Sequence, residues 1–350
     1  MTSQQTKPAD RPGQTAAGRR GVRIAGTGSY LPDKLLTNAD LEKLMDTSDE
    51  WIVQRTGIRE RHVIDPAKGE STFTLSAHAL RRALADSKID AKELDLLIVA
   101  TVCAEMACPS TACRVGEAVG MGTGGAFDIT AACCGFVYGI NIAHEMIRGG
   151  GYKTVAVIGA ETLTQYMEYN TEGRSCAIIF GDAAGAAVLR ATDDASKGIL
   201  AHSIHADGRG WRDLYIPRNL ARDLPEGIDP ATRKPGIMYM NGREVFKFAV
   251  TTFQNLIAET LEKANLRPEE VDHYVCHQSN ARILESARER FGLPQDKLYV
   301  NIGRVGNTSS ASVPVCFDEL RRAGRVHEGQ KIMFVAFGGG LTWSSSLWQI

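Results

Sequence analysis

The sequence predicts an α/β fold built from two similar halves. From about Gly21 onwards, short apolar runs typical of strands alternate with segments whose apolar residues recur at helical spacing, which is the pattern of an α/β protein. The order helix, turn and strand in residues 79–101 is repeated in residues 256–278, about half of the chain later, and residues 149–161 match residues 324–340 at nearly the same offset. Two pairs at one offset favour a duplication with a pseudo-two-fold arrangement, and chance similarity of ordinary βα units is the alternative.

The composition is that of an ordinary globular protein. Of the 350 residues, 43% are hydrophobic and 23% are charged, and the formal net charge is −1. A nucleic-acid partner would favour a large positive excess, so we expect none. No apolar run approaches the roughly 20 residues that cross a bilayer, so we expect no membrane association through a spanning segment.

Three segments are expected along the chain. Residues 1–20 are polar, contain two prolines and lack the apolar run of a secretory signal, so we expect a disordered tail, with an organellar transit peptide as the alternative. An N-terminal half is expected over residues 21–195 and a C-terminal half over residues 196–350, divided at the polar stretch RATDDASKG. Within the second half, residues 205–235 are rich in Arg, Asp, Pro and Gly, which indicates a long excursion such as a lid or an interface loop.

In the first half, the period of the apolar residues assigns the strands and helices. Gly21 begins an apolar strand that ends in Gly and Pro, and Phe127–Ala132 is a short buried strand. From Phe136 to Ile147 the apolar residues recur at helical spacing, and the three glycines of residues 149–151 end this helix.

Eight cysteines occur along the chain, at positions 103, 108, 113, 133, 134, 176, 276 and 316. In a chain of this size without a secretory signal we expect them to be reduced, which agrees with a cytoplasmic location. The spacing of Cys103, Cys108 and Cys113 matches no zinc or iron–sulfur motif, so we expect no metal site. Most of the cysteines are expected to pack as small buried hydrophobes.

A glycine motif at residues 120–125 imitates a dinucleotide-binding fingerprint. Gly120, Gly122 and Gly125 have the spacing G-x-G-x-x-G, but they follow a helical pattern and precede a strand. Pyrophosphate binding requires the opposite order, with the glycines between a strand and the N-terminus of a helix. We therefore expect no dinucleotide at this motif.

The pair of adjacent cysteines, Cys133 and Cys134, contains a candidate nucleophile. It lies where the strand Phe127–Ala132 gives way to a helix, beside backbone N–H groups without helical partners and at the positive end of the helix dipole. Such positions favour the thiolate and can lower a cysteine pKa from about 8.5 to roughly 3.5–7.5. The small residues Ala131, Ala132 and Gly135 leave room for a substrate. Packing of both adjacent thiols in the core is the alternative.

Two further polar residues lie at junctions between elements in the second half. His277 follows an apolar strand and precedes a helix expected to begin around Ser279–Asn280, and an imidazole there can exchange a proton or hydrogen-bond an oxyanion. Asn307 lies in a Gly-flanked turn before a helix expected at Ser309–Ala323, and its amide offers donors suited to stabilising an enolate. The Gly-rich turn FGGGLTW (337–343) could direct a backbone N–H to the same place. Taken singly, the histidine reads as structural and the asparagine as a helix cap.

Seven motifs then indicate a family resemblance. They are TSDEWIVQRTGIRERH (47–62), AACCGF (131–136), GRSCAIIFGDAAGA (173–186), MNGREVFKFAV (240–250), HQSNAR (277–282), GNTSSAS (306–312) and FGGGLTW (337–343). In this order they resemble the thiolase superfamily and, within it, β-ketoacyl-[acyl carrier protein] synthase III. The resemblance extends from about Gly21 to the C-terminus. It implies a thiolase-like fold in which two pseudo-duplicated halves form five layers, αβαβα.

The resemblance implies an acyltransferase that initiates fatty acid synthesis. In the implied mechanism, the Cys133 thiolate attacks an acyl-CoA thioester, and the backbone N–H groups of Cys133 and Gly339 form the oxyanion hole. Malonyl-[acyl carrier protein] then loses CO₂, and His277 and Asn307 hydrogen-bond the enolate. Its carbanion attacks the acyl-Cys133 intermediate and gives a 3-oxoacyl-[acyl carrier protein]. No cofactor is implied, because acyl-CoA is a substrate and the malonyl carboxylate generates the carbanion.

The resemblance also assigns binding residues. Trp51 stacks on adenine, and Arg55 and Arg174 meet phosphate groups, roles that suit an indole face and a guanidinium fork. The remaining CoA-binding residues are Thr47 and Asn280. The segment for the acyl carrier protein consists of Gln278, Ser279, Asn280, Ala281 and Arg282, with Ser279 in place of the usual Ala.

Two cysteines depart from the family pattern. Cys134 replaces the usual Ala beside the nucleophile, which leaves its own reactivity open. Cys108 stands where well-known members have a Phe near the acyl pocket. Because Cys is smaller than Phe, and because the partner subunit of an expected homodimer contributes this residue, we expect room for acyl primers longer than acetyl.

Single residues distinguish this sequence from enzymes of the same superfamily that have other functions. A thiolase needs a second cysteine near the C-terminal Gly-rich turn, and elongating synthases use two histidines, and this sequence fits neither pattern. A condensing enzyme or acyltransferase of a polyketide or specialised lipid pathway keeps the same three residues and stays open as an alternative. A non-catalytic subunit that binds acyl chains or carrier protein is disfavoured by the intact set of Cys133, His277 and Asn307.

Overall fold

The computed structural model describes residues 20–350, so the tail predicted over residues 1–20 lies outside the described residues except for its last position. Two large sheets organise the molecule. The first contains β1 (Gly21–Tyr30), β4 (Leu96–Ala100), β5 (Gly125–Ile129), β6 (Thr154–Thr162) and β7 (Asp182–Thr192). The second contains β8 (Gly198–Ala206), β11 (His273–Cys276), β12 (Lys331–Gly338) and β13 (Thr342–Gln349). Two short pairs complete the strands: β2 (Leu35–Thr37) with β3 (Glu60–His62), and β9 (Leu214–Tyr215) with β10 (Tyr239–Met240).

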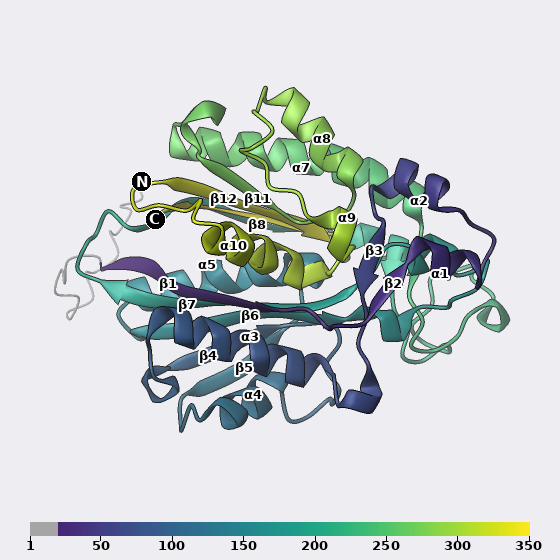
Figure 1. The fold of residues 1–350 in the computed structure, drawn as a ribbon, viewed down its shortest axis with the longest axis horizontal. Coiled ribbons are helices and arrows are strands. Elements are labelled where there is room, and N and C mark those ends of the chain that lie inside the picture. Colours follow the sequence, from purple (N-terminus) through teal and green to yellow (C-terminus); the bar gives the residue numbers. More distant parts are fainter. Residues whose placement is uncertain (1–19) are drawn as a thin grey trace, which may run out of the picture.

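Helices separate and cover the two sheets in five layers (Figure 1). Their bounds are α1 (Asn38–Glu42), α2 (Asp49–Thr56), α3 (Thr72–Ser87), α4 (Thr111–Val119), α5 (Gly135–Arg148), α6 (Arg174–Ala177), α7 (Gly242–Ala264), α8 (Ala281–Arg290), α9 (Ile302–Val305) and α10 (Ser312–Arg322). In Figure 1, α3 and α4 cover the outer face of the first sheet, α5 and α10 lie between the sheets, and α7 and α8 cover the second sheet. This arrangement confirms the predicted αβαβα layers.

The two sheets share one strand pattern, which confirms the predicted duplication. In the first sheet, β4 is parallel to β6, β6 is antiparallel to β7, and β7 is antiparallel to β1. In the second sheet, β11, β12, β13 and β8 pair in the same order and with the same directions. The first sheet has one additional strand, β5, which pairs in parallel with β4 and forms an edge. The chain passes from one sheet to the other between Thr192 and Gly198.

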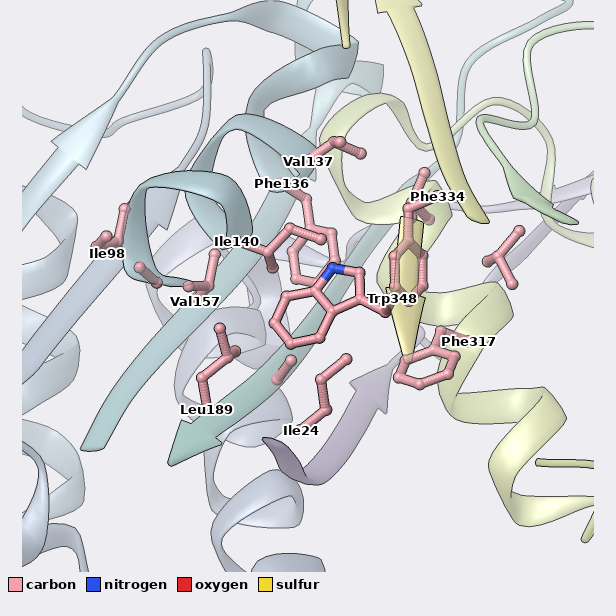
Figure 2. Packing of buried hydrophobic residues seen from close by; sticks show 14 of the residues in the cluster. Ile24, Ile98, Phe136, Val137, Ile140, Val157, Leu189, Phe317, Phe334 and Trp348 are labelled. Atoms are coloured by element: carbon pink, nitrogen blue, oxygen red, sulfur yellow. The ribbon is translucent and has the colours of Figure 1, made fainter. Parts of the chain in front are cut away.

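The core between the sheets is packed from both halves (Figure 2). Trp348 of β13 is fully buried, and Figure 2 shows its indole among side chains such as Ile24 of β1 and Phe136 of α5. Phe317 of α10 and Phe334 of β12 meet edge to face, with ring centroids 4.9 Å apart. Burial of such large apolar side chains is the main force that holds the layers together.

A glycine lets helix α5 lie close to the first sheet. A Cβ added to Gly139 would lie 2.6 Å from Val157 Cγ1 on β6, which is closer than two carbon atoms approach each other without strain. The missing side chain therefore sets the height of α5 above the sheet, and with it the position of Cys133 at the start of this helix.

Several predicted boundaries are corrected. Strand β5 ends at Ile129 rather than Ala132, because Ala132 turns the chain with a φ of +46°. Helix α8 begins at Ala281, and the Asn280 side chain caps it by accepting a hydrogen bond from the backbone N–H of Arg282. The helix predicted over Ser309–Ala323 is divided into a 3₁₀ turn, η8 (Ser309–Ala311), and α10.

The remaining predictions about organisation concern glycines, the excursion and two absences. Gly120 ends helix α4 in a left-handed conformation and strand β5 follows, which confirms the order that excludes a dinucleotide site. The stretch 205–235 is largely irregular, with the short strand β9 paired to β10.

Across residues 20–350, no helix is long and apolar enough to cross a membrane. The same residues contain no cluster of three or more His, Cys, Asp or Glu side chains arranged for a metal ion.

Candidate active site

Cys133 and Cys134 occupy different environments although they are adjacent. After β5, the chain adopts a left-handed conformation at Ala132 and forms a short 3₁₀ turn, η3 (Ala132–Cys134), before α5 begins. Cys133 is 6% exposed and lines a cavity. Cys134 is fully buried in the core between the sheets. Cys133 is therefore the thiol that a substrate in the cavity can reach.

His277 and Asn307 line the same cavity, which has a volume of about 90 Å³. His277 directly follows β11, and Asn307 follows α9 and pairs with Phe180 in an isolated bridge. One cavity thus brings together the thiol from the first half and the imidazole and carboxamide from the second. Most of its wall is apolar and consists of Ile179, Phe180, Leu214, Met240, Val245, Phe246, Phe248, Ala249, Ile283 and Phe337.

A serine holds the neutral ring of His277. Burial lowers the pKa of His277 to about 3, so the imidazole carries a single proton at neutral pH. Its Nδ1 lies 2.7 Å from Ser312 Oγ, and this hydroxyl also lies 2.9 Å from the carbonyl oxygen of Ser309. The Ser309 carbonyl oxygen can only accept, so in this arrangement Ser312 donates to it and accepts from His277 Nδ1–H. Rotation of the Ser312 hydroxyl toward Nδ1 moves the ring proton to Nε2, and in that tautomer His277 is a hydrogen-bond donor at the cavity.

The backbone orients the side chain of Asn307. Its Oδ1 accepts a hydrogen bond of 2.8 Å from the backbone N–H of Ser309. The carbonyl side of the amide is thereby occupied, and the NH₂ group is left as a donor at the cavity. Ser309 itself has a φ of +50°, which is uncommon for a residue with a side chain and is a form of strain that is concentrated at functional sites.

The predicted lowering of the Cys133 pKa is wrong. Burial raises the pKa of this thiol to about 12; the nearby Ser309 hydroxyl opposes the change, and the Glu161 carboxylate adds to it. Removal of the sulfur from water disfavours the thiolate more strongly than its neighbours favour it. The resting nucleophile is therefore a thiol, and its attack requires a proton acceptor.

Sequence reasoning missed three buried polar residues behind the cavity: Glu161, Ser309 and Ser312. Glu161 ends the buried strand TVAVIGAET and has no exposed surface, and burial raises its pKa to about 7. A carboxylate in an otherwise apolar strand is a signal that was present in the sequence, because buried acids are rare unless they have partners. The serines belong to SSAS, a run of hydroxyl residues that the structure buries almost completely.

Of the two glycines near the thiol, Gly338 is the one that borders it. A Cβ added to Gly338 would lie 2.7 Å from Cys133 N and 3.2 Å from Cys133 Sγ. At Gly339 the corresponding position faces Leu214 at 3.4 Å. The chain therefore needs glycine at position 338 for β12 to reach the nucleophile, while the predicted contribution of Gly339 is limited to its backbone.

The residues assigned to CoA gather beside α2. The guanidinium carbons of Arg55 and Arg174 lie 4.5 Å and 5.1 Å from the centroid of the Trp51 ring. Asn280 Nδ2 donates to the carbonyl oxygen of Arg55 at 2.9 Å. Thr47 Oγ1 is buried without a hydrogen-bond partner. The five side chains thus combine a flat aromatic surface, two cations and an unused hydroxyl.

The residues of the segment assigned to the carrier protein differ in burial. Gln278 is fully buried, and its side chain bonds the carbonyls of Cys276 and Tyr299 and the N–H groups of Asn301 and Ile302. All its hydrogen-bonding groups are used internally, so its side chain supports the segment from within, and its predicted place in the carrier-protein segment stays a prediction. Ser279 lines the cavity with an unpaired, buried hydroxyl. Ala281 packs against Gly57, and Arg282 is exposed, its guanidinium 5.5 Å from the Phe246 ring.

Cys108 does not line the cavity of its own chain. It is exposed in the loop between β4 and α4, and the cavity wall contains no residue from that loop. Its predicted position in the acyl pocket of the partner subunit stays a prediction.

Comparison with known proteins identifies the family. Profiles described as 3-oxoacyl-[acyl-carrier-protein (ACP)] synthase III and its C-terminal part match residues 127–208 and 261–350. The chain is 46% identical to the β-ketoacyl-[acyl-carrier-protein] synthase III of Caldanaerobacter subterraneus subsp. tengcongensis, with 93% of this chain and 96% of the relative covered.

Solved structures of related enzymes superpose on nearly the whole chain. The structure of 3-oxoacyl-[acyl-carrier-protein] synthase III from Aquifex aeolicus is 40% identical, has a TM-score of 0.86, and matches 94% of this chain and 100% of that one. The priming β-ketosynthase of the R1128 polyketide pathway is 32% identical, with a TM-score of 0.87 and coverage of 97% and 99%. Similarity of this extent confirms the resemblance found in the sequence, and the chain belongs to the 3-oxoacyl-[acyl-carrier-protein] synthase III family.

Proposed function

We propose that the protein condenses an acyl-CoA primer with malonyl-[acyl carrier protein], with loss of CO₂, to give a 3-oxoacyl-[acyl carrier protein] and so initiates fatty acid synthesis. The observation that carries this proposal is the single cavity lined by Cys133, His277 and Asn307. A nucleophile beside two neutral hydrogen-bond donors suits a reaction that first forms an acyl-enzyme and then an enolate. Membership of the family supports the same reaction.

In the first half-reaction, Cys133 takes the acyl group. Its sulfur attacks the thioester carbonyl of the acyl-CoA, and its proton moves to an acceptor in the protein. The backbone N–H groups of Cys133 and Gly339 are proposed to stabilise the oxyanion, for which such donors are worth about 10²–10³ in rate. Collapse of the tetrahedral intermediate expels CoA and leaves acyl-Cys133.

In the second half-reaction, His277 and Asn307 act on the malonyl thioester. The departing CO₂ leaves its bonding electrons on the thioester, and the enolate oxygen accepts hydrogen bonds from His277 Nε2 and Asn307 Nδ2. A neutral imidazole suits this task, because it donates without protonating the carbanion. The carbanion then attacks the acyl-Cys133 carbonyl and releases the sulfur. The malonyl carboxylate generates the carbanion, so the proposed reaction has no step that requires a cofactor.

The binding roles extend outwards from the cavity. For CoA we propose stacking of adenine on Trp51 and phosphate contacts with Arg55 and Arg174, supported by their grouping around one indole. The unpaired Thr47 hydroxyl and Asn280 complete this site. For the carrier protein we propose Ser279, Asn280, Ala281 and the exposed cation Arg282, which suits an acidic partner. The buried Ser279 hydroxyl is proposed to form a hydrogen bond with an amide group in the arm of the acyl-CoA or of the malonyl-[acyl carrier protein].

We propose a homodimer that acts in the cytoplasm, with the chain divided into halves at about residue 195. Support for the dimer comes from β5, an edge strand with unpaired backbone groups. Met106, in the loop between β4 and α4, is 49% exposed and also supports it. The eight cysteines are free, which suits a reducing compartment. In the dimer, Cys108 would widen the acyl pocket of the partner subunit. A C108F variant is then expected to lose primers longer than acetyl and to keep acetyl-CoA.

A priming condensing enzyme of a polyketide pathway is the second candidate. The R1128 priming synthase superposes on this chain as well as the 3-oxoacyl-[acyl-carrier-protein] synthase III of Aquifex aeolicus does, with TM-scores of 0.87 and 0.86. The identity of the primer and of the carrier protein distinguishes the two candidates.

Intact-mass spectrometry tests the proposed function directly. The wild type and a C134S variant, mixed with a panel of acyl-CoA thioesters, are expected to gain the mass of one acyl group. C133S serves as the matched variant and is expected to load at a far lower rate. Addition of malonyl-[acyl carrier protein] is expected to discharge the acyl-enzyme and to produce the 3-oxoacyl carrier protein. Loading of C133S at the wild-type rate would rule out this mechanism.

A further inference from the structure

Glu161 is a fully buried acid that the proposed mechanism does not yet use. It lies at the end of β6, behind the wall that carries Cys133. Its Oε2 accepts hydrogen bonds from Thr101 Oγ1 at 3.3 Å and from the backbone N–H of Val102 at 3.1 Å. Its Oε1 accepts from Ser309 Oγ at 3.2 Å and from Ser310 Oγ at 2.9 Å. Neutral donors therefore surround both of its oxygens.

Ser309 connects this carboxyl group to the nucleophile. The turn η8 packs against η3, so the hydroxyl that donates to Glu161 Oε1 lies beside the thiol of Cys133, whose pKa it lowers. A hydroxyl can accept one proton while it donates its own, so it can pass a proton between two neighbours. Ser310 provides a contrast, because its hydroxyl bonds Glu161 and the carbonyl oxygen of Ala100.

We propose that Cys133, Ser309 and Glu161 form a proton relay that activates the thiol for acyl transfer. The proposal rests on the proposed function, because it concerns the first half-reaction of that mechanism. As the sulfur forms its bond to the thioester carbon, the thiol proton moves to Ser309 Oγ, and the Ser309 proton moves to Glu161 Oε1. When the intermediate expels the CoA thiolate, one proton is returned to it, so CoA leaves as a thiol and Glu161 becomes a carboxylate again.

The alternative acceptor, His277, is less suited to this step. Its pKa is lowered to about 3 by burial, whereas that of Glu161 is raised to about 7, so the carboxylate binds the proton more readily. The enolate of the second half-reaction also requires His277 to carry its single proton on Nε2. A separate acceptor for the thiol proton leaves His277 in the form that this later step uses.

The titratable groups that face Glu161 do not compete for the proton near neutral pH. They are Cys103, Cys133 and Tyr166. Burial raises the pKa of each of them, to about 12 for Cys133 and Tyr166 and well above the ordinary thiol range for Cys103. The state of Glu161 therefore sets the charge behind the nucleophile between about pH 6 and pH 8.

Two serines that both donate to Glu161 provide a matched test. In S309A the backbone groups that hold Asn307 and Ser312 are unchanged, and only the hydroxyl between the sulfur and the carboxyl group is lost. We expect the rate of acylation by acyl-CoA above the pKa of Glu161 to fall about 100-fold in S309A, within the range of general base catalysis, while S310A keeps this rate and only shifts its pH profile upwards, because it removes a donor that lowers the pKa of Glu161. Decarboxylation of malonyl-[acyl carrier protein] without primer, which uses His277 and Asn307, is expected to remain near the wild-type rate in S309A.

The pH profile separates a relay from a structural role. In the wild type, acylation is expected to rise with pH through about 7 and then to level off, because the carboxylate form accepts the proton. E161Q is expected to acylate about 100-fold more slowly and to lose this rise. The wild type also provides a test without mutation, since movement of two protons in one step predicts a curved dependence of the rate on the deuterium fraction of the solvent.

The failure of the relay can be distinguished from failure of the proposed function. If the wild type loads acyl groups, and S309A loads them equally fast with the same pH profile, the relay is wrong and the condensing function stands. Equal losses in S309A and S310A, or a linear dependence on deuterium fraction, would also refute it. If the wild type takes no acyl group from any acyl-CoA, both proposals are wrong.

Discussion

Replacement of Gly338 by alanine tests how tightly the end of β12 confines the nucleophile. The added Cβ would lie 2.7 Å from Cys133 N, 2.9 Å from Cys133 Cβ and 3.2 Å from Cys133 Sγ. Two of these three neighbours, the backbone N and the Cβ attached to the backbone, cannot move away by rotation of a side chain. Either the end of β12 or the turn η3 that contains Cys133 must therefore shift.

The size of the shift follows from ordinary contact distances. Non-bonded heavy atoms pack at about 3.5–4.0 Å, so the shortest contact must lengthen by about 0.8 Å. Overpacking of this kind costs about 1–3 kcal/mol of stability. A displacement near 1 Å at reacting atoms can reduce the rate about 100-fold. We therefore expect G338A to fold with reduced stability and to acylate about 100-fold more slowly than wild type.

The adjacent glycine is the control. A Cβ at Gly339 meets Leu214 at 3.4 Å, which is an ordinary contact, and alanine keeps the backbone N–H proposed for the oxyanion hole. G339A is therefore expected to acylate nearly as fast as wild type. Rapid-quench mixing with acyl-CoA followed by intact-mass analysis measures the rate, and thermal unfolding reports stability. Wild-type acylation by G338A, or an equal loss in G339A, would refute the steric argument.

Three further outcomes are expected. S312A removes the hydrogen-bond partner of His277 Nδ1, so release of CO₂ from malonyl-[acyl carrier protein] should fall about 10-fold, the effect of one hydrogen bond of about 1.5 kcal/mol, while acylation by acyl-CoA is retained. A matched S346A variant should leave both rates unchanged, and equal loss of both rates in S312A would contradict a specific role at His277. W51A should raise the KM for acyl-CoA about 10-fold, because stacking of a base on an aromatic ring is worth about 1–3 kcal/mol, while kcat at saturating acyl-CoA is kept in steady-state kinetics. An unchanged KM would exclude adenine from this indole. F317A removes one ring of the buried pair with Phe334 and should lower the free energy of unfolding by about 3–5 kcal/mol in urea titrations, whereas a loss below about 1 kcal/mol would mean that the core closes around the gap.

The sequence was sufficient for the layers and for the three residues of the cavity. Repeated helix–strand units at one offset indicated two halves. Cys133, His277 and Asn307 each lie just after an apolar strand or a Gly-flanked turn, where the apolar pattern ends. Because the corresponding ends of the two halves face each other in a duplicated fold, residues at these junctions meet. Their grouping was thus predictable without coordinates.

The electrostatics and the inner support of the site were not predictable in this way. The direction of the Cys133 pKa depends on how completely the sulfur is removed from water, which no local pattern records. The side chains of Glu161 and Ser309 are hydrogen-bonded although 148 residues separate them in the sequence. Gln278 lies within a motif that resembles a docking segment, yet its amide is used entirely within the protein. Contacts between distant segments decided each of these points.

The division of the cavity between two sheets makes the proposed chemistry depend on segments that are translated late. The ribosome completes Cys133 long before His277 and Asn307, so an unfinished or truncated polypeptide has a thiol but no partner to hold an enolate. Strand β8 joins the second sheet only through β13, which ends at Gln349. In the proposed mechanism, decarboxylation of malonyl carriers therefore requires both sheets, and translation that stops before the second sheet yields products that cannot consume the malonyl pool.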